Sequence, residues 1–373
     1  MSKVGILSMQ RIFNYGSFLQ AYGLKKILED LGCNVEFVDY HPGECLVIAE
    51  SGRGLSRKIS KVLEVFRNDA PLKEKIRFIM YKKNYAANYY PYLGINKTMN
   101  YAPELDLLVV GSDEVFNCVQ NNPNVGFSPE LFGISNHAKK LISYAASFGN
   151  TTLQHLEQYK VRDRVTEYLS KFNAISVRDA NSGAVVKGLT GQEPHYNLDP
   201  VLAYDFIGKC NVIPSKVPES KYMILYGYSG RFSIEECKAI RAYAKQKGWK
   251  IFCIGGVQDC CDKFIDCSPF QVIVYFQHAE AIITDTFHGT IISVITHQKF
   301  VSLVRRGGYG NAEKLTDLLE RLHLSDRIIC DMESLSQMLA SPIKYEETDS
   351  IIRTGRKHTY EYLRQEISHC IQG

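Results

Sequence analysis

Residues 4–40 read VGILSMQRIFNYGSFLQAYGLKKILEDLGCNVEFVDY. An apolar run of strand length at 4–8 is followed by a polar loop, a helix pattern at 17–32 and a second strand pattern at 34–40. Gly32 is placed to end the helix. Strand, helix and strand in so short a span make a βαβ unit, in which the two strands run parallel with a right-handed crossover. The stretch therefore predicts an α/β fold built on a parallel sheet.

The alternation of strand and helix patterns continues along the chain. In the first half a helix pattern lies at 156–172, and strand patterns lie at 105–111, 141–146, 174–177 and 195–199. The stretch 209–220 is rich in proline, serine and lysine, which is typical of a linker. Helix and strand patterns then resume, and the strand patterns lie at 222–228, 249–256, 281–284 and 299–304.

We predict two Rossmann-like domains that face a cleft. The N-terminal domain covers 1–208, the linker 209–220 and the C-terminal domain 221–345, and a helix in 346–373 is expected to cross back to the N-terminal domain. Ligands of such sheets bind beyond the carboxyl ends of the strands, and two sheets in tandem place these ends across a shared cleft. Polar residues directly after a strand are therefore the candidates for function.

The composition is that of a globular protein. Of the 373 residues, 45% are hydrophobic and 23% are charged, which excludes a disordered chain. The net charge of +4 gives no reason to expect a nucleic-acid partner, yet it suits anionic substrates. No signal peptide and no apolar stretch of membrane-spanning length is visible, so we expect a cytoplasmic protein. The eleven cysteines lack paired CxxC spacing, so they are expected to be reduced thiols and not metal ligands.

The stretch 284–290, TDTFHGT, joins a strand pattern to a helix pattern. Thr286 or Asp285 is placed to cap the helix, whose first backbone N–H groups then form an anion site. Gly289 leaves room for a phosphate close to the backbone. His288 is placed to donate a proton or to add a positive charge. A capped helix with an internally satisfied histidine is an equally good interpretation of these residues alone.

Polar residues follow other strand patterns as well. They are Asn14, Tyr15, Gly16 and Ser17 after the first strand, Ser112 and Asp113 after 105–111, Arg178 after 174–177, and Arg305 and Arg306 after 299–304. An arginine here is suited to bind a carboxylate or a phosphate, and an aspartate to act as a general base, although capping and solvation are the structural alternatives. The GxGxxG motif is absent, which argues against a nicotinamide cofactor. Because all these positions fall at carboxyl ends of strands, together they indicate an enzyme cleft.

At these residues the chain resembles the polysaccharide pyruvyl transferase family. The resemblance covers most of the length and rests on the opening NYGSFLQAY, on GSDEVFN at 111–117, on ISVRDANSG at 175–183 and on TDTFHGT. It implies a GT-B-like glycosyltransferase architecture. It also implies transfer of the enolpyruvyl carbons of phosphoenolpyruvate onto two hydroxyls of a sugar, as a pyruvate ketal, in a bacterial capsular or exopolysaccharide or its lipid-linked precursor.

The resemblance also implies roles for the candidate residues. His288 would protonate the donor, and Asp113 would orient or deprotonate the acceptor. Donor binding would fall to Arg178, Thr286, Gly289, Arg305 and Arg306, and acceptor or loop contacts to Asn14, Tyr15, Gly16 and Ser112. Beyond phosphoenolpyruvate as donor, neither a cofactor nor a metal is expected, because protein cations are able to hold the leaving phosphate.

One stretch departs from the family pattern. Many relatives carry an arginine after a loop asparagine, whereas this chain has Asn311, Ala312, Glu313 and Lys314 at those positions. A cation there would come from Arg305, Arg306 or Lys314, or the acceptor would differ. Two other functions stay open at this point, a GT-B glycosyltransferase that uses a nucleotide sugar and a non-catalytic homologue that acts in polysaccharide assembly.

The segment 53–83 holds ten lysine and arginine residues against three acids, and the stretch from Tyr81 to Tyr92 adds five tyrosines. Apolar residues in 55–66 recur at helical spacing. Basic amphipathic helices with aromatic residues adhere to anionic membranes, which predicts a peripheral contact with the inner face of the membrane through 53–92. A solvated helix pair packed on the first domain is the commoner arrangement for such a charge pattern.

Overall fold

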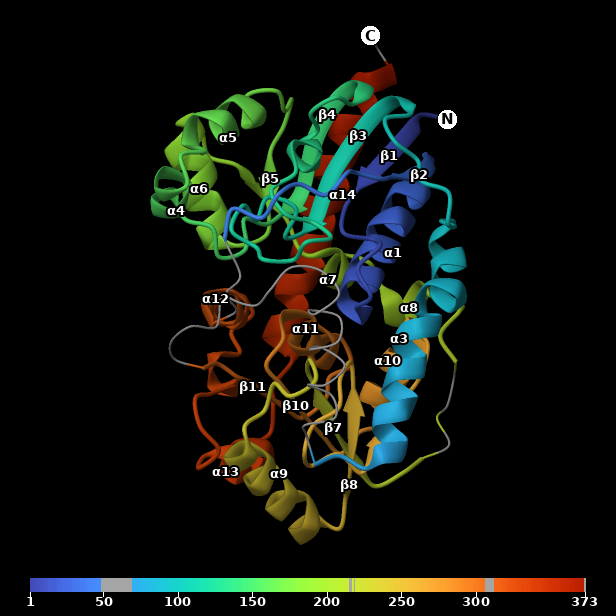
Figure 1. Ribbon diagram of the computed structural model, residues 1–373, viewed down its shortest axis with the longest axis vertical. Helices are drawn as coiled ribbons and strands as arrows, with labels where there is room; N and C mark the ends of the chain where they lie inside the picture. The colour runs from blue at the N-terminus through green and yellow to red at the C-terminus, as the bar shows by residue number, and fades with distance from the viewer. Residues whose placement is uncertain (48–68, 215–216, 218, 306–311, 372–373) are drawn as a thin grey trace.

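The computed structural model describes residues 1–47, 69–214, 217, 219–305 and 312–371. These residues form two parallel six-stranded sheets, one above the other, with helices around each (Figure 1). The predicted α/β class with two Rossmann-like domains is therefore confirmed. None of the helices in the described ranges is long and apolar enough to cross a membrane.

The N-terminal sheet has the strand order β2-β1-β3-β4-β5-β6. Its strands are β1 (Lys3–Leu7), β2 (Asn34–Val38), β3 (Glu104–Asp113), β4 (His137–Ala146), β5 (Ser176–Val177) and β6 (His195–Tyr196). The helices of this half are α1 (Tyr15–Asp30), α3 (Leu72–Leu93), α4 (Leu153–Gln158), α5 (Arg162–Leu169), α6 (Ala180–Thr190), α7 (Pro200–Ala203) and α8 (Phe206–Lys209), with a 3₁₀ turn at Pro129–Phe132.

The C-terminal sheet has the order β12-β11-β10-β7-β8-β9. Its strands are β7 (Tyr222–Tyr226), β8 (Lys250–Ile254), β9 (Lys263–Phe264), β10 (Ala281–Thr284), β11 (Phe300–Leu303) and β12 (Ile328–Ile329). Its helices are α9 (Ile234–Lys247), α10 (Pro269–Gln277), α11 (Phe287–Ile295), α12 (Ala312–Arg321) and α13 (Leu335–Ala340), with a 3₁₀ turn at Ser325–Arg327. The range 209–220 was expected to be a linker. Its first residue, Lys209, is the end of α8, and its other described residues lead to β7 without forming a helix or strand.

The opening βαβ unit forms as its sequence indicates, since β1 and β2 pair in parallel across α1. Helix α1 begins at Tyr15 rather than at the predicted residue 17, because the side chain of Asn14 accepts the N–H of Gly16 and so caps the helix two residues earlier. The helix pattern at 156–172 is wrong as a single helix. The chain turns between α4 and α5 at Lys160, whose φ of 55° is left-handed and incompatible with a continuous helix.

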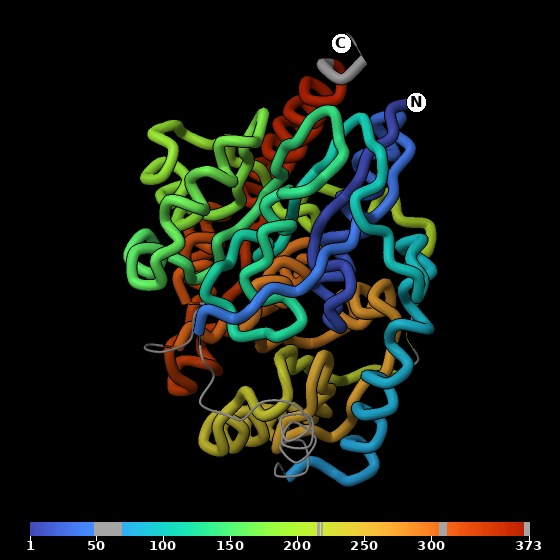
Figure 2. Tube along the Cα trace, turned by 45° about the horizontal axis from the view of Figure 1, so that its top comes forward, coloured from blue at the N-terminus to red at the C-terminus, as the bar shows by residue number. Residues whose placement is uncertain are grey.

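Two long helices join the halves of the molecule. Helix α14 (Glu346–Ile371) begins beside the C-terminal domain, where Asp349 pairs with His297, and reaches the N-terminal sheet, where Glu366 pairs with Lys140. Helix α3 runs along one side of both domains (Figure 2). Its Glu74 accepts the backbone N–H of Phe264 on the edge strand β9. These helices fix how the two sheets face each other.

Each sheet has a point at which the strand order reverses. In the N-terminal sheet the reversal lies between β1 and β3, and in the C-terminal sheet between β7 and β10. The loops that follow neighbouring strands diverge to opposite sides at such a point and leave a crevice at the carboxyl edge of the sheet. The site described next lies where these two crevices meet.

Candidate functional site

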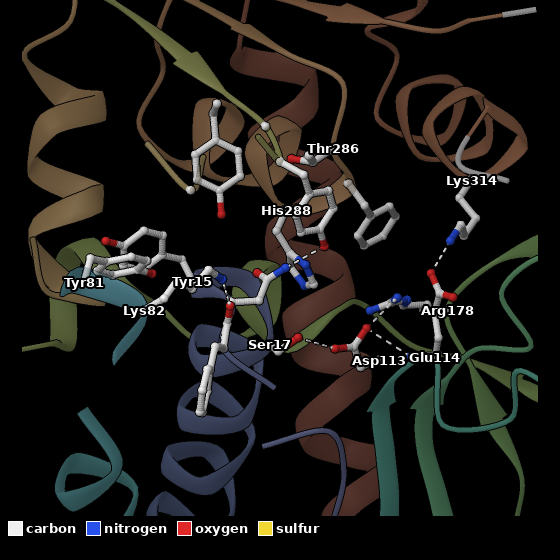
Figure 3. Close-up of a pocket in the computed structure, with 17 residues that line it drawn as sticks. Tyr15, Ser17, Tyr81, Lys82, Asp113, Glu114, Arg178, Thr286, His288 and Lys314 are labelled. Atoms are coloured by element: carbon white, nitrogen blue, oxygen red, sulfur yellow. Dashed lines mark hydrogen bonds and ion pairs between the residues drawn. The ribbon is translucent and has the colours of Figure 1, made fainter. Parts of the chain in front are cut away.

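A pocket between the domains is lined by the loops after β1, β3, β7 and β10 (Figure 3). Both switch points therefore contribute to one site, as expected for a ligand held between two doubly wound sheets. Helices α3 and α12 add Lys82 and Lys314 at its walls. The lining residues are Phe13, Asn14, Tyr15, Ser17, Tyr81, Lys82, Asp113, Glu114, Arg178, Tyr226, Gly227, Tyr228, Gly255, Thr286, Phe287, His288 and Lys314.

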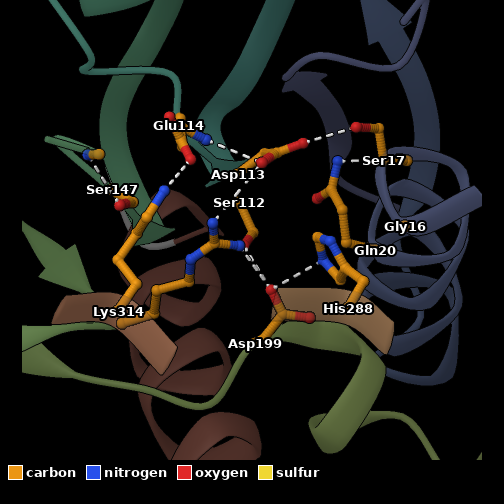
Figure 4. A network of polar contacts seen from close by, with 12 residues as sticks. Gly16, Ser17, Gln20, Ser112, Asp113, Glu114, Ser147, Asp199, His288 and Lys314 are labelled. Carbon is orange, nitrogen blue, oxygen red and sulfur yellow. Dashed lines mark hydrogen bonds and ion pairs between the residues drawn. The ribbon is translucent and has the colours of Figure 1, made fainter. Parts of the chain in front are cut away.

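Asp199 connects the two residues that the sequence singled out most clearly. Its carboxylate accepts a hydrogen bond from Arg178 at 2.6 Å and lies 3.5 Å from Nε2 of His288 (Figure 4). Burial disfavours the charged carboxyl, but the interactions with His288 and Arg178 and the backbone N–H of Val201 outweigh it and hold the pKa of Asp199 at about 2. A carboxylate from the N-terminal domain thus lies beside the imidazole of His288 in the C-terminal domain and is its counter-ion whenever that ring is protonated.

Asp113 lies on the other side of Arg178. Its Oδ2 accepts the hydroxyl of Ser17 at 2.8 Å, and its Oδ1 lies 3.5 Å from a guanidinium nitrogen of Arg178. The guanidinium itself packs on the ring of Phe287, with Cζ 4.5 Å from the ring centre. Arg178 is therefore buried between two carboxylates and a ring, and it is a paired cation rather than the open fork expected from the sequence.

Glu114 and Lys314 form an ion pair across the domain boundary, from the loop after β3 to α12. Burial opposes ionisation of Glu114, but Lys314, Asn117 and Arg178 together hold its pKa at about 2. Both side chains line the pocket. Of the two described cations proposed for the family's missing arginine, Arg305 and Lys314, the structure brings Lys314 to the pocket.

The corner TDTFHGT carries the polar end of α11. Thr286 is the cap, since its hydroxyl accepts the N–H of Gly289 at 3.0 Å. Within the described residues, the backbone N–H groups of Phe287 and His288 have no protein acceptor, so they are available to an anion. A glycine is needed at position 289 for a different reason from the one expected. A Cβ there would lie 2.2 Å from Thr284 and 2.7 Å from Tyr226, so the glycine makes room for protein atoms and not for phosphate.

The opening of α1 approaches α11 closely. A Cβ on Gly16 would lie 2.3 Å from Nδ1 of His288, so only glycine lets the histidine lie there. Asn14 caps α1 and also donates to the hydroxyl of Tyr228 at 2.7 Å, across the domain boundary. Tyr15 is buried and donates to the carbonyl of Cys267 in the C-terminal domain. These residues bring the domains together at the pocket.

Four of the described candidate site residues do not line this pocket, namely Gly16, Ser112, Gly289 and Arg305. Ser112 is fully buried behind it, where its hydroxyl contacts Ala145 and Asp199. Arg305 pairs with Asp285 and Glu236 on the C-terminal domain. Asp285 is buried and also accepts from Arg231, so it does not cap α11. Arg306 lies outside the described residues.

The model of the polysaccharide pyruvyl transferase family matches residues 14–306, which include every lining residue of the pocket except Phe13 and Lys314. The chain belongs to the polysaccharide pyruvyl transferase family. It is therefore an enzyme of a transferase family. A comparison with curated proteins finds no match.

Solved structures that are similar to this pyruvyl transferase family member match it at low sequence identity. The MnaA–UDP structure from S. aureus has a TM-score of 0.54 and 11% identity, and the match covers 100% of this chain and 97% of that one. UDP-GlcNAc 2-epimerase from Neisseria meningitidis, bound to UDP-GlcNAc, has a TM-score of 0.49 and 9% identity over 99% and 100% of the two chains. The glycotransferase of kitacinnamycin has a TM-score of 0.47 and 10% identity, again over 99% and 100%. The likeness to MnaA shows the fold alone, which is the GT-B architecture.

The sequence patterns did not single out Asp199 and Glu114 of this pyruvyl transferase site, and they did not indicate that Lys82 lines the pocket. Asp199 is the last residue of the strand pattern at 195–199, so the rule that selected Asp113 at the carboxyl end of a strand also applies to it. Glu114 stands beside Asp113 but had no visible partner, because Lys314 is distant in sequence. In the sequence, Lys82 is one of the ten basic residues of 53–83. In the structure, its Nζ donates to the carbonyl of Phe13 at the pocket wall.

A metal has no evident place in the described structure. Within the described ranges, no three histidine, cysteine, aspartate or glutamate side chains are grouped so that they could hold a metal ion. The charges at the pocket are three cations, Lys82, Arg178 and Lys314, with His288 beside them, and two pocket carboxylates, Asp113 and Glu114. An anionic ligand is therefore offered ammonium and imidazole groups together with the N–H groups of α11.

Proposed function

We propose that the protein transfers the enolpyruvyl group of phosphoenolpyruvate onto two hydroxyls of a sugar, which forms a pyruvate ketal on a bacterial capsular or exopolysaccharide or its lipid-linked precursor. The observation that carries the proposal is the convergence of His288, Arg178 and Lys314 with Asp113 on one pocket between the switch points of both sheets. The family supports a pyruvyl transferase, and the donor and acceptor are part of the proposal.

The pocket suits a donor that carries a carboxylate and a phosphate. Lys82 and Lys314 reach it from α3 and α12, and the unpaired N–H groups at the start of α11 lie beside His288. Each charge-assisted hydrogen bond contributes on the order of 1.5–3 kcal/mol to binding. Arg178 lies between Asp113 and Asp199, and we assign the direct contacts with the donor to Lys82 and Lys314 at the pocket walls.

The reaction needs an acid, a base and a stabilised leaving group. In the proposed sequence His288 gives a proton to the methylene carbon of phosphoenolpyruvate, and the central carbon becomes an oxocarbenium ion. One sugar hydroxyl bonds to that carbon and loses its proton to Asp113. The bond to phosphate breaks with its electron pair on the phosphate oxygen, and the second hydroxyl takes its place. The two hydroxyls release two protons. One of them balances the proton that His288 gave to the methyl group, and the other leaves on the released phosphate.

The proposal is tested by ligand protection followed by turnover. Phosphoenolpyruvate should raise the melting temperature of the protein, whereas UDP should not. Phosphate release from phosphoenolpyruvate with a sugar acceptor present should then be abolished in Lys314→Met and preserved in Lys344→Met, a control on a lysine away from the pocket. Protection by UDP and not by phosphoenolpyruvate would favour a nucleotide-sugar glycosyltransferase. Protection by neither would favour a non-catalytic role in assembly.

We also propose that the outer face of α3 contacts an anionic membrane surface. Leu72, Ile76 and Met80 recur every four residues on this helix and are 61%, 50% and 46% exposed, and Lys73 and Lys83 are exposed beside them. This face differs from the one that the sequence indicated, because four of the five tyrosines point inward and are buried. The basic residues of 53–68 lie outside the described part of the chain.

Sedimentation with liposomes tests the membrane contact. The protein should sediment with vesicles rich in anionic lipid at low salt, and far less with neutral vesicles or at high salt. Replacing Leu72, Ile76 and Met80 together by serine should abolish the binding, whereas Tyr101→Ser, at an exposed aromatic residue away from α3, should preserve it. Sedimentation that is unchanged in the triple variant, or absent in the parent protein, would refute the contact.

A further inference from the structure

Two exposed aromatic side chains stand at the rim of the pocket, one from each domain. Phe13 follows β1 and is 41% exposed, and Tyr228 follows β7 and is 49% exposed. Both line the same pocket as Asp113 and His288. Large apolar side chains left open to solvent at a binding site mark a place where a ligand covers them. The chemistry assigned above to His288, Asp113 and the lysines uses neither ring.

Phe13 is held rigidly. Its ring packs on two tyrosines of α3, with centre-to-centre distances of 5.4 Å to Tyr85 and 6.1 Å to Tyr90, and both tyrosines are buried. Its carbonyl accepts the ammonium of Lys82 at 2.6 Å. One side of the ring is therefore backed by packed protein, and the exposed part is turned outward at the pocket wall.

Tyr228 is anchored at both ends. Its hydroxyl accepts the side-chain amide of Asn14, the residue next to Phe13, at 2.7 Å. Its carbonyl accepts the side-chain amide of Gln258 at 2.6 Å. The hydrogen bond from Asn14 ties this ring to the loop that carries Phe13, so the two aromatic residues keep a fixed relation across the domain boundary. A pair of fixed aromatic surfaces loses little conformational entropy when a ligand binds.

We propose that Phe13 and Tyr228 form a binding platform for the pyranose ring of the acceptor sugar. A pyranose has a hydroxyl-bearing edge and a face of C–H groups, and this face packs on the exposed aromatic rings. The proposal rests on the proposed function, because it assigns the acceptor to the outer part of the same pocket. Asp113 then faces the hydroxyl edge of the sugar, while His288 and Lys314 act on the donor in the same pocket.

The chemistry of a cyclic ketal explains why such a platform is needed. Two hydroxyls of one sugar must reach the same carbon in turn, so the ring has to keep its orientation through both attacks. Hydrogen bonds to the reacting hydroxyls cannot hold the ring, since those groups lose their protons during the reaction. Apolar contact with the unreactive C–H face holds it without using any group that reacts.

Saturation-transfer NMR on the full chain tests this assignment without the natural acceptor. The probes are the methyl glycosides of glucose, galactose and mannose at millimolar concentration, with phosphoenolpyruvate present. The parent protein should transfer saturation mainly to ring C–H protons of at least one glycoside. Phe13→Ala and Tyr228→Ala should each weaken its binding about tenfold, whereas Phe13→Tyr and Tyr228→Phe should retain it. Tyr101→Ala, which removes an exposed aromatic ring stacked on His41, is the control and should change nothing.

Turnover gives a second readout with the glycoside that binds. Phe13→Ala should raise the KM for the sugar about tenfold and leave the KM for phosphoenolpyruvate unchanged, because the ring touches only the acceptor. Absence of saturation transfer in the parent protein, or equal transfer in the alanine variants, would overturn the platform even if phosphoenolpyruvate protects the protein from melting. Transfer that depends on Phe13 without protection by phosphoenolpyruvate would instead overturn the proposed donor and leave the platform standing.

Discussion

His288 owes its position to residues from the other domain. Asp199 lies 3.5 Å from its Nε2, and Gly16 leaves the space that its ring fills. Nε2 is buried, faces the Asp199 carboxylate and makes no hydrogen bond within the described residues. A histidine that lines a pocket beside an ionised carboxylate suits a general acid.

His288→Gln keeps a polar side chain of similar reach and removes the transferable proton. The rate constant kcat for phosphate release should fall about 10²–10⁴-fold, while phosphoenolpyruvate still raises the melting temperature. His323→Gln is the matched control, since His323 is an exposed histidine paired with Glu347 on the same domain. Equal kcat in His288→Gln and the parent protein would remove the histidine from the mechanism.

Gly16→Ala probes the same contact from the facing helix. The new Cβ would meet the ring of His288 at 2.3 Å and its Cβ at 2.6 Å, and both belong to a packed helix of the other domain. Separating α1 from α11 should destabilise the protein by about 1–3 kcal/mol and lower kcat as well. Chemical denaturation and phosphate-release assays measure the two effects. If the variant has the stability and the kcat of the parent protein, α1 and α11 are able to move apart without loss of stability or activity, which would contradict the prediction.

At the scale of elements, α3 works as a brace between the domains. Its tyrosines Tyr81 and Tyr85 pack against Tyr15 at the start of α1, and its Phe78 packs against Phe264 on β9. Tyr89 on α3 and Tyr15 on α1 both donate to the carbonyl of Cys267, at 2.8 and 2.9 Å. Most of the tyrosines of α3 are therefore buried at the domain boundary, where they hold the two domains together.

The double variant Tyr15→Phe with Tyr89→Phe keeps both rings and leaves the buried carbonyl of Cys267 without either donor. Its free energy of unfolding should fall by about 1–3 kcal/mol, the usual penalty for an unsatisfied buried polar group. Denaturant unfolding measures the change, and Tyr92→Phe at an exposed position should change stability by less than about 0.5 kcal/mol. A double variant as stable as Tyr92→Phe would show that water or another donor satisfies the carbonyl.

At the scale of the molecule, two ionised carboxyls hold the domains together at the pocket. Asp199 and Glu114 each face a cation or histidine of the C-terminal domain, and the pKa of each is about 2 when folded. Unfolded aspartate and glutamate have pKa values near 4. The folded state therefore binds fewer protons than the unfolded state between pH of about 4 and 2, so this stabilisation is complete above that interval and is lost as the pH falls through it.

Melting temperatures recorded from pH 7 down to about 3 should show this loss. Glu114→Gln should melt below the parent protein at neutral pH, and the difference should shrink on acidification because the parent loses the contribution that the variant already lacks. Differential scanning calorimetry of both proteins gives the comparison. A difference that stays constant or widens toward pH 3 would mean that Glu114 is not held ionised by Lys314.

Several features were predictable because they depend on neighbours in sequence. The βαβ unit at 4–40 follows from its hydrophobic periodicity, and the cap at Thr286 follows from a threonine placed before a helix. The positions of His288, Asp113 and Asn14 at the pocket followed from the rule that sites of parallel sheets lie at carboxyl ends of strands. Lys160, which breaks the helix pattern at 156–172, gave no such local signal.

The sequence by itself determined most of the strands and helices, the two parallel sheets and the edge on which the polar loops lie, because each depends on periodicity and turn chemistry within a few dozen residues. The partners of the charged groups were decided only by the tertiary structure. Arg178 pairs with Asp199, Lys314 pairs with Glu114, and the ring of His288 packs against Gly16. These contacts join residues that lie far apart in the chain. Packing of two domains against each other sets these contacts, and no local pattern records which surfaces will meet.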